Sequence, residues 1–436
     1  MSINIIGGGL AGCEAAYQVA KRGIKVNLYD MKPNKKSPAH HSDKLCELVC
    51  SNSLKAARKE SAAGMLKEEM RMLDSLLMKC ADKSKVPAGG ALAVDREIFS
   101  NLVNDEINNN PNITVISEEV TEIPDGITII ASGPLTSDLL SDKIKTMFGD
   151  SLSFYDAAAP IVKFDTVDMN KAFFASRYDK GDGDDYINCP MNKEEYDNFY
   201  EALVSAERAP VHDFDVMNPK VYEGCMPIEV MAQRGHDTIR FGPMKPVGLK
   251  DPRTGHRPWA VVQLRKENSA GIMYNLVGFQ TNLKFPEQKR VFSMIPGLEN
   301  AEFVRYGVMH RNTFIDSPRI LNSDYSVREN KNLFFAGQIT GVEGYMESAS
   351  SGLMAGINAA MRYIGEQTVT LPEYTMIGSL SRYISDETVS KFQPMGANLG
   401  VLPELEQRPR DKKERAKAYS DRSFAKLTEF INSRGL

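Results

Sequence analysis

Residues 3–16, which read INIIGGGLAGCEAA, decide the fold of this chain. Four mostly apolar residues predict a short buried strand, and after a glycine-rich turn the residues 13–22 predict a helix. The spacing Gly7-x-Gly9-x-x-Gly12 is typical of a loop that binds the pyrophosphate of a dinucleotide. The following helix offers unpaired N–H groups and a partial positive charge to those phosphates. We therefore expect a Rossmann-like α/β unit here.

Each glycine of this loop has its own physical role. Gly7 allows the tight turn out of the strand, Gly9 lets the backbone approach the phosphates, and Gly12 lets the helix pack on the strand. A second predicted strand, residues 25–29, ends at Asp30, close to the position about 20 residues on where a carboxylate holds a ribose hydroxyl. An ordinary tight turn is the alternative, and the loop alone does not distinguish NAD from FAD. The expected contacts are Gly7, Gly8, Gly9, Leu10, Ala11, Gly12 and Asp30.

The composition of the chain indicates an ordinary globular protein. Its 436 residues predict two or three domains, with 42% apolar and 25% charged residues. The net charge of −4 means that a surface for nucleic acid must be a local patch. The sequence lacks the long apolar run of a membrane span, and because it begins with a predicted strand we expect no secretory leader. Six scattered cysteines then suggest reduced thiols and a cytoplasmic protein.

The middle of the chain predicts further elements and a second domain. We expect helices over residues 62–78 and 96–108, the latter capped by Asp95, and a short helix over residues 44–50. Residues 113–117 and 127–132 predict strands, and residues 86–94 a loop. From about residue 165 to 296 prolines, aromatics and short alternating strands predict an α+β insertion. The expected division is an FAD-binding domain, residues 1–165 and 300–436, around an insertion domain, residues 166–299.

A second strand–glycine–helix unit follows the insertion. Residues 332–336 predict a buried strand, GQITG follows at residues 337–341, and residues 348–364 predict a helix rich in small residues. With the first glycine loop this is the pattern of large FAD-binding folds, whose second helix points its N-terminus at the flavin. An unrelated second βα unit is the alternative. We expect Gly337, Gln338 and Gly352 to contact the cofactor, and the tail after Tyr374 to be largely helical.

Two cysteines stand in polar, turn-rich surroundings. Cys50 lies in ELVCSNS and Cys225 in EGCMPIE, where a thiol is better placed to act as a nucleophile than in an apolar run. A small buried hydrophobe is the common alternative for each. Cys46 precedes Cys50 by one helical turn, but no Cys-x-x-Cys pair or His-x-x-x-His completes a zinc site, so we expect no metal. His40 and His41 could be ligands or proton carriers, and a solvated loop is the commoner alternative for each. The basic run at residues 408–417 is either a solvated helix face or a phosphate-contacting patch.

These motifs together resemble a known family, the bacterial folate- and FAD-dependent tRNA (uracil-5-)-methyltransferases. The resemblance runs nearly end to end and includes PAHHSDKLCELVCSNSLK, VPAGGALAVDR, EGCMPIEVMAQRG, RFGPMKPVGL and FFAGQITGVEGYMESASSGLMAGINAA. ELVCSNSL and EGCMPIE are highly specific, whereas the last block is shared with the FAD proteins that modify wobble uridines. Family members commonly have Glu-Met-Arg-Pro where this chain has Asp30-Met31-Lys32-Pro33; Lys32 keeps the charge and is expected to contact the cofactor.

The resemblance implies a methyl transfer to carbon 5 of a T-loop uridine in tRNA. Methylenetetrahydrofolate would give the one-carbon unit, and FAD recharged by NADPH or NADH would give the electrons. Cys50 and Cys225 match the family's two catalytic cysteines, with the nucleophile and the acid/base partner unassigned. Tyr345 is expected to support the flat folate near the flavin. The choice between NADPH and NADH and the oligomeric state stay open.

Several rival functions remain at this stage. Wobble-uridine modification is disfavoured because that family is longer and carries a large C-terminal helical domain. Methylation of a ribosomal RNA uridine is a further alternative. A non-catalytic RNA-binding flavoprotein is disfavoured by the presence of both cysteine motifs, and a plain NADH oxidase would consume neither RNA nor folate.

Overall fold

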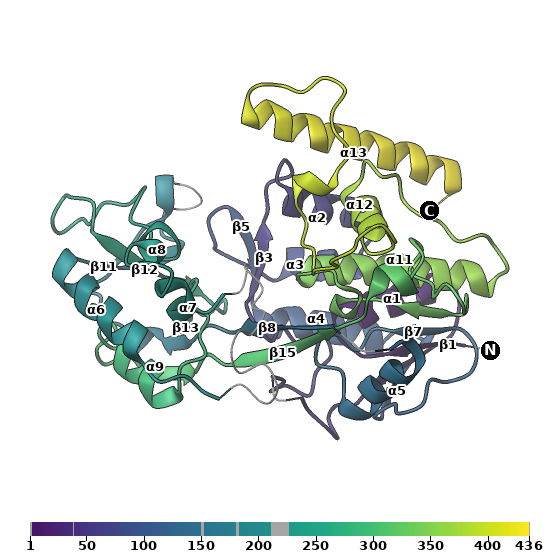
Figure 1. The fold of residues 1–436 in the computed structure, drawn as a ribbon, viewed down its shortest axis with the longest axis horizontal. Coiled ribbons are helices and arrows are strands. Elements are labelled where there is room, and N and C mark those ends of the chain that lie inside the picture. The colour runs from purple at the N-terminus through teal and green to yellow at the C-terminus, as the bar shows by residue number, and fades with distance from the viewer. Residues whose placement is uncertain (1, 38, 150–151, 180–182, 211–225, 436) are drawn as a thin grey trace.

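One of the two lobes of the protein is organised around a parallel five-stranded sheet, ordered β16-β7-β1-β2-β6 (Figure 1). The computed structural model describes residues 2–37, 39–149, 152–179, 183–210 and 226–435. The sheet contains β1 (Ile3–Ile6), β2 (Val26–Asp30), β6 (Ile113–Ser117), β7 (Thr128–Ile130) and β16 (Leu333–Phe335). β1 is buried along its whole length and pairs in parallel with both β2 and β7. Its near-continuous apolar sequence is therefore that of a central strand covered on both faces.

Two long helices cross closely beside this sheet. α1 (Leu10–Lys21) follows β1, and α11 (Tyr345–Tyr363) follows β16. A Cβ on Gly352 would lie 2.1 Å from the carbonyl oxygen of Ala11, and one on Gly356 would lie 2.7 Å from that of Ala15. Only glycine permits this approach, so the small residues of α11 serve the helix crossing.

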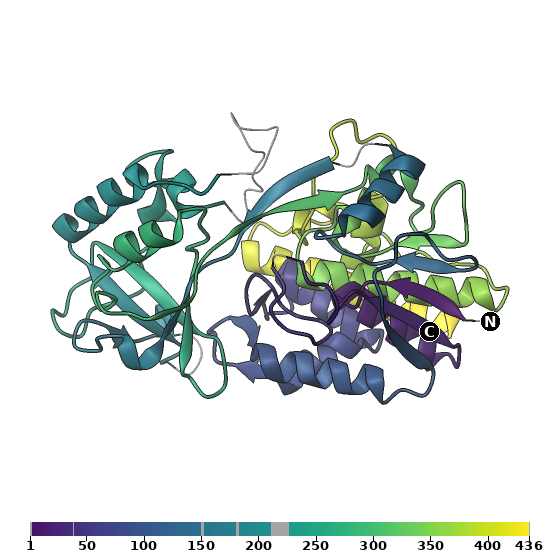
Figure 2. The ribbon, with the colours of Figure 1, turned by 90° about the horizontal axis from the view of Figure 1, so that it is seen from below.

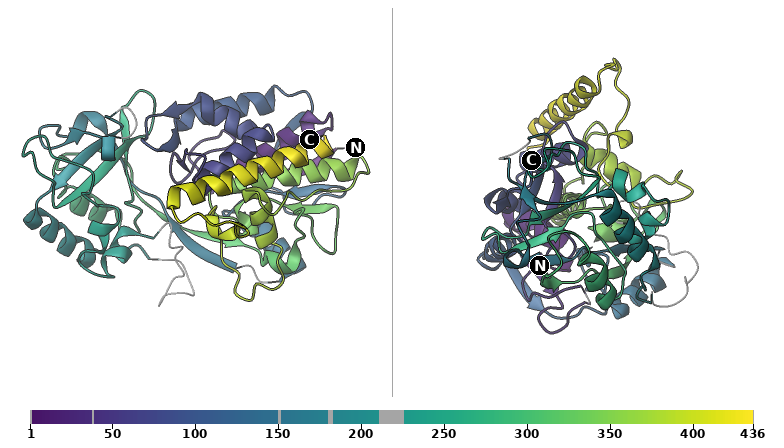
Figure 3. Two further views of the ribbon diagram at one scale, coloured as in Figure 1. Left: turned by 90° about the horizontal axis from the view of Figure 1, so that it is seen from above. Right: turned by 90° about the vertical axis from the view of Figure 1, so that its left-hand side faces the viewer.

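Shorter elements complete this lobe. They are α2 (Ala62–Met72), α3 (Leu76–Lys83), α4 (Arg96–Asn108), α5 (Asp138–Phe148), α10 (Ser317–Ile320), and the antiparallel sheet of β3 (Ser53–Ala56), β5 (Ala91–Val94) and β4 (Lys85–Val86). Near the C-terminus α12 (Met376–Tyr383) packs on α2, and α13 (Lys412–Arg434) lies along the outside of the lobe (Figure 3). Among the described residues no helix has both the length and the apolar character to cross a membrane.

The other lobe is built on an antiparallel six-stranded sheet, ordered β10-β11-β12-β13-β9-β14. Its elements are β9 (Ile161–Lys163), β10 (Phe173–Phe174), β11 (Tyr186–Met191), β12 (Ala260–Lys266), β13 (Met273–Leu276), β14 (Phe303–Arg305), α6 (Lys193–Ser205), α7 (Ile228–Ala232), α8 (Thr238–Phe241) and α9 (Phe285–Phe292). It has its own apolar core, which includes Tyr196, Phe199, Phe279 and Phe292. The antiparallel pair β8 (Leu152–Ala157) and β15 (Met309–Phe314) runs between the lobes (Figures 1 and 2).

The predicted fold class is confirmed, and several local predictions are not. Residues 44–50 form no helix, because Cys46 has a left-handed φ of 55° and its N–H donates to the carbonyl of Gly8. The helix expected over residues 62–78 is two helices, since Asp74 has a φ of 62° and breaks the backbone between them. Residues 86–94 contain β5, and the tail is helical only in α12 and α13. The domain boundaries stay a prediction.

Candidate active site

A cavity opens where all five parallel strands of the first sheet end. Its lining residues follow the carboxyl ends of β1, β2, β6, β7 and β16, which is where open α/β sheets bind their ligands. Most come from these strand ends and from α1, α11 and the loop after β2: Gly7, Gly8, Gly9, Leu10, Ala11, Asp30, Lys32, His40, Glu47, Val49, Glu118, Ser132, Gly133, Gly337, Gln338, Tyr345 and Ser348. Of the expected cofactor contacts, only Gly12 and Gly352 do not line it.

The glycine loop keeps a space open at the N-terminus of α1. A Cβ on Gly7 would lie 2.5 Å from the carbonyl oxygen of Ala131, and one on Gly12 would lie 1.8 Å from that of Gly7. A Cβ on Gly9 would meet nothing within 4 Å. No described side chain caps the first turn of α1, so its N–H groups point to the open space. Gly7 and Gly12 serve packing, and Gly9 leaves the room that a pyrophosphate needs.

Asp30 is held by the same loop. Its Oδ2 accepts a hydrogen bond from the N–H of Gly8 at 2.8 Å, and its Oδ1 accepts one from the N–H of Lys32 at 2.8 Å. The Lys32 ammonium donates to the carbonyl of Lys44 and is therefore turned along the loop. Each Asp30 oxygen keeps a free lone pair, so the carboxylate can accept ribose hydroxyls from a fixed position.

The second half of the cavity comes from the unit after β16. Gly337 has a φ of 86° and brings the chain to the cavity beside Gln338, whose Nε2 donates to Glu343 at 2.6 Å. Gly352, expected as a cofactor contact, lies instead against the backbone of α1. Tyr345 is the first residue of α11, which begins three residues before the predicted start at residue 348, and it lines the cavity.

Tyr345 connects the cavity to Cys50. Its hydroxyl oxygen accepts hydrogen bonds from the backbone N–H of Cys50 at 2.7 Å and of Ser51 at 3.1 Å. The Cys50 thiol is half-buried and lies 3.8 Å from the carbonyl oxygen of Ala157, at the end of β8. Cys50 therefore lies between Tyr345, which lines the cavity, and the end of β8, which belongs to the strand pair between the lobes. Cys225, the other expected catalytic residue, lies outside the described residues.

The remaining described cysteines differ from Cys50 in burial. Cys13, Cys46, Cys80 and Cys189 are buried. Burial raises the pKa of Cys46 well above its usual range, and it raises the pKa of Cys80 and of Cys189 to about 12. Cys46, Cys80 and Cys189 therefore stay protonated. Cys13 is buried and its thiol donates to the carbonyl oxygen of Gly8 at 3.3 Å, so Cys50 is the reactive candidate among the described cysteines.

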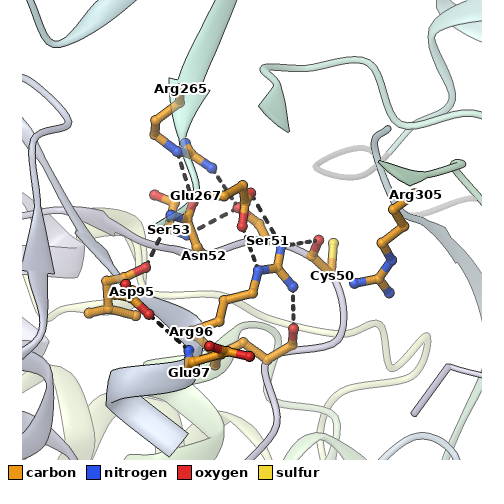
Figure 4. A network of polar contacts seen from close by, with 12 residues as sticks. Cys50, Ser51, Asn52, Ser53, Asp95, Arg96, Glu97, Arg265, Glu267 and Arg305 are labelled. Atoms are coloured by element: carbon orange, nitrogen blue, oxygen red, sulfur yellow. Dashed lines mark hydrogen bonds and ion pairs between the residues drawn. The ribbon is translucent and has the colours of Figure 1, made fainter. Parts of the chain in front are cut away.

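Three arginines surround the Cys50 segment, and the sequence did not reveal them (Figure 4). Arg96 of α4 donates to the carbonyls of Leu48 and Cys50 and pairs with Glu267 at 2.6 Å. Arg265 of β12 donates to Asn52 Oδ1 at 3.0 Å and Ser51 Oγ at 2.8 Å, and Arg305 of β14 donates to the carbonyl of Val49 at 2.6 Å. The three arginines are far apart in the sequence, so the sequence does not show that they meet. Only Arg96 lies in one of the motifs noted above, VPAGGALAVDR.

Other candidate residues take defined places as well. His40 lines the cavity, with Nδ1 at 2.6 Å from Ser37 Oγ, and burial followed by the charge of Lys32 lowers the pKa of its imidazole. No cluster of three or more His, Cys, Asp or Glu side chains in the described part of the chain could hold a metal ion. The basic run ends in the exposed first turn of α13.

Comparison with known proteins identifies the family. The family model described as "Glucose inhibited division protein A" matches residues 2–367. A solved structure of Aquifex aeolicus GidA has a TM-score of 0.71 at 17% identity, over 99% of this chain and 73% of that one, which shows a shared fold. A relative from Acetivibrio thermocellus is 61% identical over 99% of this chain and 98% of its own length. Another from Bacillus pumilus is 60% identical over 99% of both chains.

Both relatives carry the same name, "Methylenetetrahydrofolate--tRNA-(uracil-5-)-methyltransferase TrmFO". Each match covers 99% of this chain and therefore extends across both lobes. The chain therefore belongs to the methylenetetrahydrofolate–tRNA-(uracil-5-)-methyltransferase family.

Proposed function

We propose that this protein methylates carbon 5 of a T-loop uridine in tRNA, with methylenetetrahydrofolate as carbon donor and FAD as reductant. The observation that carries the proposal is Tyr345, which lines the cavity and also holds the backbone of Cys50. A redox cofactor in the cavity and a nucleophilic sulfur would thus belong to one site. The names of the relatives supply the folate and the tRNA.

The residues of the cavity fit FAD. The open space at Gly9 and the uncapped N-terminus of α1 suit the pyrophosphate, and the fixed Asp30 carboxylate suits ribose hydroxyls. Gly337, Gln338 and Tyr345 would border the flavin end, beneath the N-terminus of α11. When bound there and reduced by NADPH or NADH, FAD would supply the two electrons that the folate-derived methylene unit needs to become a methyl group.

The cysteines provide the covalent chemistry on uracil. Carbon 5 of uracil is a poor nucleophile until a thiolate adds to carbon 6. In that step the sulfur–carbon 6 bond forms, and the electron pair of the carbon 5–carbon 6 double bond moves toward the carbon 4 carbonyl oxygen. Carbon 5 can then bond to the methylene carbon, and a base must remove its proton before the sulfur leaves. Cys50 and Cys225 would share these two roles.

Nucleoside analysis tests the proposal. The purified protein is incubated with an unmodified tRNA transcript, NADPH and folate labelled with carbon-14 in its methylene group. The expected product is labelled 5-methyluridine in the T-loop, formed without S-adenosylmethionine. Label at the wobble position, or label only in a ribosomal RNA fragment offered in parallel, would replace this function by one of its two alternatives.

A tRNA with 5-fluorouridine at the target assigns the two sulfurs. Fluorine does not leave as a proton does, so the covalent adduct on carbon 6 should persist. Mass spectrometry of the trapped peptide then identifies the nucleophile. An adduct on Cys13, Cys46, Cys80 or Cys189 would contradict the proposed site.

A further inference from the structure

The Cys50 segment carries more positive than negative charge. Three guanidinium groups face it, from α4, β12 and β14, and the described carboxylates beside it are Glu267 and Glu47. The phenol of Tyr345, on the α11 side, is neutral because burial raises its pKa. A negative charge on Cys50 would balance the cluster. Since partly buried charges are stable only when they are paired, the surroundings favour an anion at this position.

Arg305 is one of two arginines of this cluster that have no carboxylate within ion-pair distance among the described residues. Arg96 has a carboxylate partner in Glu267, which is almost fully buried, and Arg265 binds two neutral side-chain oxygens. Arg305 donates to the Val49 carbonyl, and no described carboxylate lies within ion-pair distance of it. Burial lowers the pKa of Arg305, and the charge of Arg96 lowers it further. Figure 4 shows the guanidinium end of Arg305 turned toward Cys50.

We propose that Arg305 is a positioning residue that holds Cys50 as a thiolate in the resting protein. Its hydrogen bond to Val49 fixes the residue before Cys50, and its charge stands beside the sulfur (Figure 4). Arg96 and Tyr345 hold the Cys50 backbone from the other side. Residues from both lobes thus prepare the sulfur before any RNA is bound.

The thiolate serves either role that the proposed function gives to Cys50, and the inference rests on that function. A nucleophile must lose its proton before the sulfur–carbon 6 bond forms, and a base must be without a proton to take the one from carbon 5. In both cases the proton of Cys50 is released to solvent beforehand, so that no other group has to remove it during the reaction.

The test is the pH dependence of alkylation of Cys50. Purified full-length protein with its bound cofactor is treated with iodoacetamide from pH 5 to 10, and the peptide that contains Cys50 is quantified by mass spectrometry. In the parent protein the midpoint should lie below the ordinary value of about 8.5 for a free cysteine. In Arg305→Gln the midpoint should rise by about one pH unit, so that the rate at pH 7 falls about threefold to fivefold for a parental midpoint between about 6.5 and 7. Arg305→Lys should recover most of that loss.

Two further variants separate charge from structural damage. Arg290→Gln removes an exposed guanidinium that is paired with Glu287 on α9, and it should leave the Cys50 profile unchanged. Glu267→Gln removes a negative charge from the cluster and should move the midpoint in the opposite direction to Arg305→Gln. The proposal is overturned if the alkylation midpoint of the parent lies at the ordinary value of about 8.5. It is also overturned if Arg305→Gln and Arg290→Gln give the same dependence of alkylation on pH. Because the assay contains neither RNA nor folate, its outcome is independent of the methylation assay.

Discussion

Gly9 and Gly352 lack a side chain for opposite reasons. A Cβ on Gly9 would enter open space, whereas one on Gly352 would lie 2.1 Å from the Ala11 carbonyl oxygen. Gly9 therefore leaves room for a ligand, and Gly352 leaves room for another helix. Both glycines were predicted from the sequence to contact the cofactor, and only Gly9 lines the cavity.

Replacement of Gly9 by Glu should abolish flavin binding. The new side chain would fill the space at the N-terminus of α1 and place a negative charge where the pyrophosphate needs positive potential. The parent protein should be yellow and release FAD on denaturation, whereas the variant should be colourless. Gly90→Glu is the matched control, because a Cβ there also meets nothing within 4 Å but Gly90 does not line the cavity. A yellow Gly9→Glu protein with FAD at the parental ratio would refute the assignment.

Among the elements, α2 is linked to the two C-terminal helices through one buried carboxylate. Glu69 accepts hydrogen bonds from the N–H groups of Met376 and Ile377, at the start of α12, and from Ser423 Oγ of α13. Burial raises the pKa of Glu69 from 4.5 to about 7. The folded state thus binds this proton more tightly than the unfolded state. Its contribution to stability is complete below about pH 4.5 and is lost as the pH rises through about 7.

The Glu69→Gln variant should lose this pH dependence. Urea denaturation gives the free energy of unfolding of both proteins. Between pH 5 and 8 the value for the parent should fall by up to about 3 kcal/mol relative to the value for the variant. The matched control is Glu68→Gln, which alters the neighbouring residue on α2, a partner of Lys59 and Arg71 near the surface. In that control the free energy of unfolding should depend on pH as it does in the parent. Equal pH slopes for the parent and Glu69→Gln would exclude a titrating Glu69.

The first turn of α13 is the basic surface that we expect to contact tRNA. Lys412 and Lys413 are exposed there, beside the cap residue Asp411, although cations at a helix N-terminus are unfavourable for the helix itself. Reversing both charges with Lys412→Glu and Lys413→Glu should weaken tRNA binding. It should also lower the number of counterions released on binding by about two, which reduces the salt dependence of the affinity. Filter binding at several salt concentrations measures both quantities.

The control places the same change at the other end of the helix. Lys426→Glu with Arg434→Glu should leave the affinity near that of the parent. If the Lys412/Lys413 variant also binds like the parent at every salt concentration, the basic run is only a solvated helix face.

At the scale of the whole molecule, the sequence revealed the local elements of the site and missed what holds them together. The glycine spacing, Asp30 and the strand–glycine–helix unit at residue 337 are short-range patterns, and the structure contains them. The helix predicted over residues 44–50 does not form, because backbone groups of this segment bond to Gly8, Tyr345 and the arginines instead of to one another. Contacts among residues tens to hundreds of positions apart leave no periodic signal in a single sequence.

The Cys50 segment contacts Tyr345 at the cavity, the end of β8 between the lobes, and Arg305 of the other lobe. Formation of 5-methyluridine by a Cys50→Ala variant therefore tests most directly whether the cavity and the cysteine form one active site. The variant should keep its FAD and lose 5-methyluridine formation, while Cys80→Ala, in the buried face of α3, should methylate like the parent. A Cys50→Ala protein that binds FAD and methylates tRNA near the parental rate would contradict the proposed site.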